Sequence, residues 1–267
     1  MKTLFDIGSE RKASGEHTLL LEIGRECCCY AFLHRPTKTI DRIFVSATDE
    51  FQLDNQVKEL LQSLKGNTFN DVVVCSAFPQ ALLFPHKYFT SDYTALDVIY
   101  EQPAQKYFHD LLPEWQMVNA YSLPDSVYAS LEESFSSVRY VHCYTPAIRV
   151  PNDVVADAQL SVHFSEQYIR VLLKKDMHVH LAQTYAYKTP LDVIYYLLKI
   201  CYEFGLSQQE VVIILSGLVE KDSNLFTDVQ QYFTQILFAG QPEIGLPSSP
   251  HPHYFFTSIY NLAACVS

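Results

Sequence analysis

Ser216 and Gly217 end an apolar run, VVIILSG at 211–217, just before a polar segment that opens a helix. A strand that ends in a turn of small residues before a helix is a common phosphate site, because backbone N–H groups and the helix dipole point at the anion. This pair therefore raises the hypothesis of a phosphate site. Whether such a site works depends on the acidic and glycine residues that accompany it elsewhere in the chain.

Two His-x-His pairs have a spacing that metal ligands can use. His178 and His180 share one face of an expected strand, but a zinc site needs further ligands and none is indicated nearby. His251 and His253 lie in QPEIGLPSSPHPHYFF, a segment whose Pro and Gly content is more typical of a connection than of a metal clamp. We therefore predict no metal site.

Three consecutive cysteines, Cys27 to Cys29, lie in an expected strand, where successive side chains face opposite sides. A reactive thiolate needs a base or a cation beside it, and Arg25 is the only local candidate. The chain has 7 cysteines, without the spacing of a disulfide framework. We interpret them as reduced, structural thiols. No P-loop, nucleophile elbow, HExxH helix or CxxC pair occurs, so we predict no catalytic residue.

The first half of the chain predicts three strands in an antiparallel meander, then a helix and a fourth strand. The strands are the segments 18–23, 28–34, 39–47 and 71–77. An apolar stripe with the i, i+3, i+4, i+7 spacing of a helix runs from Val57 to Leu64. Thr48 or Asp49 is the expected N-cap, and Gly66 lies just past the end.

The second half repeats this order at a nearly constant distance. Its strands are the segments 159–164, 168–174, 178–187 and 210–217. Its helix begins at Thr189 and Pro190, a favourable N-cap and N1 pair, and ends at Gly205. Gly66 and Gly205 are 139 residues apart, and other matched positions differ by 137 to 141. We predict two β-β-β-α-β units; the alternative is a chance likeness between two ordinary α/β segments.

This duplicated plan resembles the actin-like ATPase fold, which is ribonuclease H-like and carries one such unit in each of two domains facing a nucleotide cleft. The chain also resembles an uncharacterised bacterial family of actin-like-fold proteins and, more distantly, the actin-like component of the pilus-assembly platform. Besides the repeat, the likeness includes CSAFPQALLFP at 75–85 and MVNAYSLPDSVYASL at 117–131, and it covers about residues 18–240. The resemblance implies an α/β fold in two domains.

The resemblance also implies where a nucleotide would bind. An Asp-x-Gly-Thr or Asp-x-Gly-Ser motif in the first hairpin would organise Mg²⁺ and admit phosphate. Its counterpart here has Glu22 for the Asp, keeps Gly24 and places Arg25 at the hydroxyl position. A second Asp-x-Gly is expected in the second hairpin, where this chain has His163 and Ser165. One motif is therefore half present and the other absent.

A third motif of the resemblance is a Gly-Gly pair that packs against adenosine. It corresponds to Ser216 and Gly217, so one glycine is lost. We therefore predict a degenerate site with no cofactor; the alternative is ATP with Mg²⁺ bound through Glu22. Gly24 is also explained as an ordinary hairpin glycine. The helix expected after the pair is capped near Asp222 and Ser223, and its apolar face is Leu225, Val229, Tyr232, Phe233 and Ile236.

The composition limits the class of partner. The chain of 267 residues is 48% hydrophobic and has a formal net charge of −11, so it can bury a core but lacks the basic surface of a nucleic-acid binder. The same charge disfavours an anionic membrane surface. No apolar run reaches the roughly 18–20 residues that span a bilayer, and the first residues lack the apolar region of a signal peptide. We predict a cytoplasmic protein that does not insert into a membrane.

The predicted first domain spans residues 1–147, with an insertion at 78–147, and the second spans 148–240. Residues 241–267 form a Pro/Gly linker followed by an apolar tail, which has to pack on its own sheet or on a partner. Within the insertion the pattern predicts a helix near 91–101, a strand near 116–122, a helix from 124 or 125 to about 135, a strand at 138–144 and a crossing segment at 145–158.

A complete fold plan with eroded site motifs favours a catalytically inactive, actin-like-fold protein that serves as an interaction or scaffold module for another protein. A divergent ATP-binding protein or phosphotransferase that uses Glu22 is the second hypothesis. A homodimer formed through the aromatic surface and the tail is the third.

Overall fold

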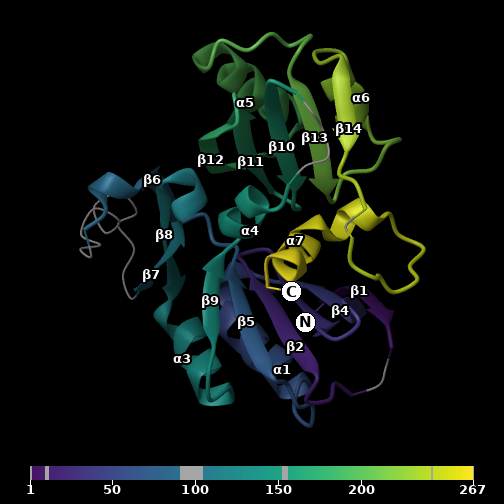
Figure 1. Cartoon of the computed structure of the whole chain (residues 1–267). Coiled ribbons are helices and arrows are strands. Elements are labelled where there is room, and N and C mark those ends of the chain that lie inside the picture. Colours follow the sequence, from purple (N-terminus) through teal and green to yellow (C-terminus); the bar gives the residue numbers. More distant parts are fainter. Residues whose placement is uncertain (1, 10–11, 91–104, 152–155, 242, 267) are drawn as a thin grey trace. The chain divides into compact units, whose positions relative to one another are not determined.

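A computed structural model describes the chain apart from residues 1, 10–11, 91–104, 152–155, 242 and 267 (Figure 1). Contacts divide it into two compact units. Unit 1 is Met1–Arg149, Pro242–Pro250 and Ile259–Ser267, and unit 2 is Val150–Gln241 and His251–Ser258. The domain limits expected from the sequence, at 1–147 and 148–240, stay a prediction.

Unit 1 is built on a six-stranded sheet of order β1-β4-β3-β2-β5-β9. The strands are β1 (Lys2–Gly8), β2 (His17–Ile23), β3 (Cys27–His34), β4 (Thr39–Ala47), β5 (Asp71–Ser76) and β9 (Arg139–His142). The β2–β3–β4 meander is antiparallel, whereas β5 runs parallel to β2 and β9 parallel to β5. The four predicted strands are confirmed to within one residue at each end. The edge strand β1, which pairs with β4, was not predicted.

Both faces of this sheet are buried at its centre, at β2 and β5, as their mainly apolar sequences predict. On one face, Leu19, Leu21 and Ile23 join a core cluster with residues of α1 (Leu53–Ser63) and α3 (Asp125–Ser134). On the other face, Leu20 and Glu22 are buried as well. Asp49 caps a 3-10 turn, η1 (Glu50–Gln52), and α1 follows it, so the predicted cap lies one short turn ahead of the α-helix.

The insertion of unit 1 adds a three-stranded antiparallel sheet of order β6-β8-β7. Its strands are β6 (Ala81–Pro85), β7 (Gln105–Leu112) and β8 (Met117–Pro124), with short 3-10 turns η2 (His86–Tyr88) and η3 (Pro113–Trp115). The predicted strand near 116–122 and the helix from 125 are confirmed as β8 and α3. The helix predicted near 91–101 lies outside the described residues.

The chain after β9 corrects one prediction. The strand expected at 138–144 ends at His142, and α4 (Tyr144–Arg149) follows, where only a crossing segment was expected. Pro146 lies in the first turn of α4, where its missing N–H would have had no partner within the helix. Pro146, which lies in the expected crossing segment, is therefore compatible with the start of a helix.

Unit 2 repeats the plan as a five-stranded sheet of order β12-β11-β10-β13-β14. Its elements are β10 (Ala158–Phe164), β11 (Tyr168–Lys175), β12 (His178–Ala186), α5 (Pro190–Glu203), β13 (Val212–Gly217), α6 (Asn224–Gln230) and β14 (Gln235–Phe238). The predicted strands are confirmed to within two residues. Thr189 caps α5 in a capping box with Asp192, as the Thr-Pro pair indicated. The core combines β10, β11 and β13 with α5 and α6.

The helix predicted to continue to Ile236 is wrong beyond Gln230. Ser223 is its N-cap, but α6 has 7 residues, and Ile236 belongs to β14, which pairs in parallel with β13 at Ile213. The four-residue spacing of Val229 and Phe233 suggested a longer helix. Pairing with β13 instead satisfies the backbone groups of that strand's open side.

The apolar tail packs within the chain itself. After a 3-10 turn, η4 (His253–Phe256), it forms α7 (Thr257–Val266), in which Ile259, Tyr260, Leu262 and Ala263 are buried. The part of α7 from residue 259 belongs to unit 1. Among the described residues, no helix is long and apolar enough to cross a membrane.

Candidate functional site

The first hairpin, between β2 and β3, is closed by its own backbone and by Thr48. The Gly24 N–H donates to the Cys27 carbonyl at 3.0 Å. The Thr48 N–H donates to the Glu26 carbonyl at 2.7 Å, and its hydroxyl lies 2.9 Å from the Arg25 carbonyl oxygen. A Cβ at position 24 would lie 3.1 Å from Ala77 Cβ. Gly24 therefore lets this loop pass close to the end of β5.

Glu22 lies in a row of side chains that crosses three strands. It pairs in register with Cys29 of β3 and with Cys75 of β5, and all three residues are buried. Tyr260 of α7 lies close enough to Cys29 for the two groups to interact electrostatically. Burial, and then the nearby Glu22 carboxylate, raise the pKa of the Cys29 thiol well above its usual value. The thiol is therefore protonated and unreactive at neutral pH.

Arg25 turns its side chain to a carboxylate of its own unit. Its Nε lies 3.4 Å from Glu50 Oε1, in the short turn η1. The Arg25 side chain is 20% exposed and that of Glu50 is 59% exposed. The cation at the hydroxyl position of the motif is thus paired at the surface with the segment that follows β4.

The second hairpin holds a histidine at the position of the expected acid. His163 of β10 pairs in register with Ser216 of β13, and His163 Nδ1 lies 3.0 Å from Ser216 Oγ. Burial, and then the cation of Arg170, lower the pKa of His163 well below its usual value. The imidazole is therefore neutral at pH 7. His163, at the expected acid of the second hairpin, therefore contacts Ser216, at the first glycine position of the Gly-Gly motif.

Ser165, at the expected glycine position, uses its backbone to close this hairpin. Its N–H donates to the Tyr168 carbonyl at 2.9 Å, and its carbonyl accepts from the Tyr187 hydroxyl at 2.9 Å. Both backbone groups that face the turn are thus engaged within unit 2. Glycine is not required for either contact.

Gly217 has a structural reason that does not involve a ligand. Its φ is +77°, and a Cβ there would lie 2.1 Å from the carbonyl oxygen of Phe164. The next residue, Leu218, donates its N–H to the same carbonyl at 2.9 Å. The end of β13 therefore crosses the end of β10 so closely that only glycine fits. The first helical residue, Asn224, comes only after a further connection.

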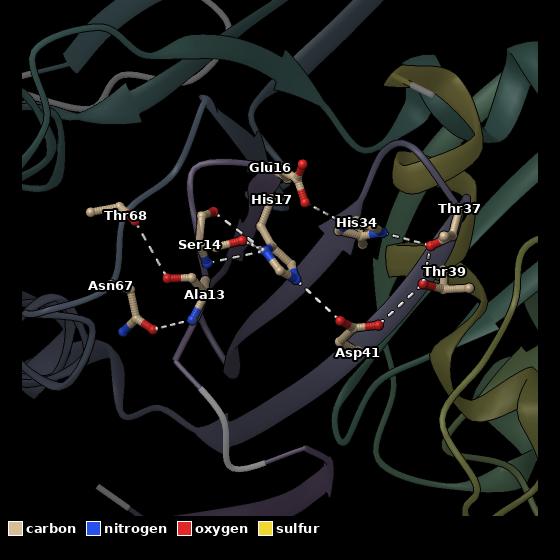
Figure 2. A network of polar contacts seen from close by, with 10 residues as sticks. All are labelled: Ala13, Ser14, Glu16, His17, His34, Thr37, Thr39, Asp41, Asn67 and Thr68. Atoms are coloured by element: carbon tan, nitrogen blue, oxygen red, sulfur yellow. Dashed lines mark hydrogen bonds and ion pairs between the residues drawn. The ribbon is translucent and has the colours of Figure 1, made fainter.

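A polar network that was not predicted lies at the opposite end of β2 (Figure 2). His17 Nε2 lies 3.1 Å from Asp41 Oδ2, and His17 Nδ1 lies 3.1 Å from the Ser14 hydroxyl. A serine beside a histidine and an aspartate can form an activated nucleophile. Here the Ser14 N–H also donates to Nδ1 at 3.1 Å, so the ring nitrogen already has a backbone partner. We interpret the network as a clamp that holds the chain before β2 to β4.

A second unpredicted cluster joins the inserted sheet to the main sheet of unit 1. The Asp110 carboxylate of β7 accepts from the His142 N–H at 2.9 Å, the Thr145 hydroxyl at 2.6 Å and the Tyr121 hydroxyl at 3.3 Å. Burial raises the pKa of Asp110, although these three donors stabilise its charged form. One half-buried acid thus ties β7 to β8, β9 and α4. No motif in the sequence marked it, because its partners come from separate segments.

Within the parts of the chain that the structure describes, no group of three or more His, Cys, Asp and Glu residues is arranged to hold a metal ion. His178 and His180 are both exposed on β12. The candidate site therefore consists of two separate sets: Glu22, Gly24 and Arg25 in unit 1, and His163, Ser165, Ser216 and Gly217 in unit 2.

The sequence matches a family model described as "Protein of unknown function (DUF3822)" over residues 10–236. A comparison with curated proteins gave no match. Among solved structures, a Bacteroides thetaiotaomicron protein with actin-like ATPase fold and unknown function is similar, with a TM-score of 0.80, 14% identity and coverage of 94% of this chain and 96% of that chain. The PilM-PilN type IV pilus biogenesis complex is also similar, with a TM-score of 0.58, 12% identity and coverage of 96% and 99%. The fold is therefore that of the actin-like ATPases.

Proposed function

The chain belongs to the DUF3822 family, and from that premise we propose that it is a non-catalytic, actin-like-fold module that works by binding another protein. In this module the residues at the nucleotide-motif positions make contacts within the chain instead of binding a nucleotide. The same proposal includes two domains, at 1–147 and 148–240, and no bound cofactor.

The observation that carries the proposal is the contact between His163 and Ser216. In two of the three motifs, the second Asp-x-Gly and the Gly-Gly pair, the replacing residues lie 3.0 Å from each other. The imidazole is neutral, so this position supplies no negative charge to organise Mg²⁺. The motif glycine that remains, Gly217, is accounted for by its close approach to Phe164. These features support a protein that uses the actin-like fold as a binding surface and not for nucleotide chemistry.

A protein partner is supported by the similarity to the PilM-PilN complex, in which a protein of this fold is assembled with another protein. A chain of net charge −11 fits such a partner better than a nucleic acid.

Isothermal titration calorimetry of the whole chain with Mg-ATP tests the proposal. We expect no heat of binding, and no rise in the melting temperature at millimolar Mg-ATP, because any ligand that binds the folded state tightly would stabilise it. Glu22→Ala should behave like the unchanged chain in this titration. Glu166→Ala, which removes an exposed carboxylate in the turn of the second hairpin, is the matched control.

The alternative of a divergent ATP-binding protein is favoured by one observation, the carboxylate retained at Glu22. Micromolar binding that is lost in Glu22→Ala and kept in Glu166→Ala would establish this alternative and overturn the proposal. Micromolar binding that both variants keep would also overturn it, and would place the nucleotide away from Glu22.

A further inference from the structure

Helix α5 exposes an apolar stripe on the face turned away from its core. The helix buries one side in unit 2 through Val193, Ile194, Leu197, Ile200 and Cys201. Beside that buried side, Leu191 is 66% exposed, Tyr195 58% and Tyr202 85%, and Leu198 between them is partly buried. Scattered surface apolar residues need no explanation, but four on one line of a single helix form a continuous patch.

The spacing of this stripe is that of a coiled-coil seam. Leu191, Tyr195, Leu198 and Tyr202 are separated by four, three and four residues, which places them at alternating d and a positions of a heptad. The stripe runs for about 16 Å along the helix axis. A seam of this kind packs against another helix rather than against a loop or a flat sheet.

We propose that this α5 seam (Leu191, Tyr195, Leu198 and Tyr202) docks on the α5 seam of a second copy of the chain, with the two helices antiparallel. The proposal rests on the proposed function, since it names one partner for a protein-binding module. In an antiparallel pair an a position faces a d position, so Tyr195 packs on Leu198 of the second copy and Leu191 on its Tyr202. Each tyrosine thus meets a leucine, and the contact is the same from both sides.

The charges beside the seam favour this orientation. Asp192 and Lys199 occupy the e positions, and in an antiparallel pair e residues face e residues. Asp192 of each copy then lies opposite Lys199 of the other, which gives two pairs of opposite charge. A parallel pair would set these residues against g positions, which are Ile194 and Cys201 and are buried in their own unit. Only the antiparallel arrangement offers each charge a partner.

Asp192 is fixed in place before any partner arrives. Its Oδ2 accepts from the backbone N–H groups of Lys188 and Thr189 at 2.9 and 2.8 Å, and these bonds hold the pKa of Asp192 below its usual value. It is therefore an ordered, charged group beside the first residue of the seam. Little side-chain entropy remains for it to lose on docking.

A contact made mainly by one helix pair is small for a stable dimer, so the association is weak, with a Kd on the order of 100 µM. Analytical ultracentrifugation of the whole chain, from about 10 µM to about 1 mM, covers this range. The average mass should rise with concentration from 30.6 kDa towards twice that value. Tyr195→Glu should remain at the mass of the monomer, because it buries two carboxylates in the seam.

A charge reversal tests the orientation. Lys199→Glu sets like charges opposite each other and should weaken the dimer about tenfold. Lys58→Glu makes the same change at an exposed position of α1, outside the seam, and is the matched control that should dimerise like the unchanged chain. Circular dichroism should show the same folded spectrum for all variants, because the three positions are exposed.

Three results would overturn the proposal. The unchanged chain could stay monomeric to about 1 mM, which is well above the expected Kd. Tyr195→Glu could dimerise normally, which would place the interface elsewhere. Lys199→Glu could associate as tightly as Lys58→Glu, which would exclude the antiparallel pairing. None of these results bears on Mg-ATP binding, so the two proposals fail or stand separately.

Discussion

The two hairpins that open the repeated units have changed in different ways. In the first, Glu22 keeps a carboxylate, Gly24 remains, and Arg25 pairs with Glu50 at the surface. In the second, the acid and the glycine are both replaced, and His163 bonds to a residue of the neighbouring strand. The same place in one fold has thus kept an acidic residue in one unit and lost it in the other.

This difference shows that one fold accepts two arrangements of side chains at the same place. A buried carboxylate is costly unless it is paired or hydrogen-bonded. At the second hairpin a neutral imidazole and a serine hydroxyl satisfy each other. At the first hairpin Glu22 is buried between Cys29 and Cys75, and after burial itself this acid raises the pKa of the Cys29 thiol. The first hairpin thus keeps an ionisable acid among buried groups, whereas the second has a neutral histidine.

The largest effect should come from the glycines. Gly217→Ala should lower the free energy of unfolding by about 4 kcal/mol, because the new Cβ meets a backbone oxygen and φ is positive. Gly24→Ala should cost about 1 kcal/mol or less, since its neighbour is a methyl group at 3.1 Å and φ is not in the left-handed region. Urea unfolding of both variants measures the contrast.

Gly205→Ala separates the two reasons why alanine is unfavourable at position 217, which are the positive φ and the close approach of Phe164. Gly205 also has a positive φ, of +61°, but nothing lies within 4 Å of a Cβ there. We expect it to cost roughly 1 kcal/mol, the usual penalty for a left-handed residue that is not glycine. If Gly217→Ala cost no more than Gly205→Ala, the close approach of Phe164 would not be what requires the glycine.

The next effect is a pH dependence that belongs to the second hairpin alone. Because the pKa of His163 is lowered in the folded chain, the unfolded chain binds a proton first as pH falls. This histidine therefore lowers stability below about pH 6.5, and the loss grows as pH falls towards its folded pKa. By pH 5 we expect up to about 2 kcal/mol of loss relative to pH 7.

His163→Gln should remove this part of the pH dependence and keep a hydrogen bond within reach of Ser216. Urea unfolding at pH 7 and pH 5 should therefore show a smaller loss for the variant than for the unchanged chain. An equal loss in both chains would mean that His163 is protonated in the folded state, and the neutral-histidine account of the second hairpin would have to be abandoned.

The smallest effect is expected at Arg25. An ion pair at a distance of 3.4 Å with an exposed glutamate contributes little, so Arg25→Ala should cost about 0.3 kcal/mol. Glu50→Ala and the double variant complete a thermodynamic cycle for the pair. A coupling free energy above about 1 kcal/mol would show a stronger tie in the first hairpin than exposed pairs provide.

Much of the fold could be predicted because the local signals agree with the final packing. Thr189 and Pro190 mark the start of α5, and the structure adds the Asp192 half of the capping box. The edge strand β1 gave no clear signal, because KTLFDIG has one buried residue and its stability depends on pairing with β4. The sequence pattern also predicts a single helix where the structure has the short α6 and the strand β14. The pairing of β14 with β13, which the local sequence does not show, accounts for the difference.

The candidate site was predictable as a set of positions but not as a set of contacts. The motifs implied by the resemblance located His163 and Ser216 separately, whereas only the sheet register brings them to 3.0 Å. The need for glycine at 217 depends on the path of β10, 53 residues earlier in the chain. Asp110 had no motif at all, because its three donors come from β8, β9 and α4.

The return of the C-terminal segment to unit 1 has a consequence for protein synthesis. Strands β1 to β5 leave the ribosome before unit 2 does, but the part of α7 from residue 259 belongs to the same unit as these strands and is made after unit 2. Until then Cys29 lacks Tyr260 beside it, and the apolar face of α7 is absent from the unit. Unit 1 therefore cannot finish packing before the chain of unit 2 has been synthesised. It is complete only once α7 has been made.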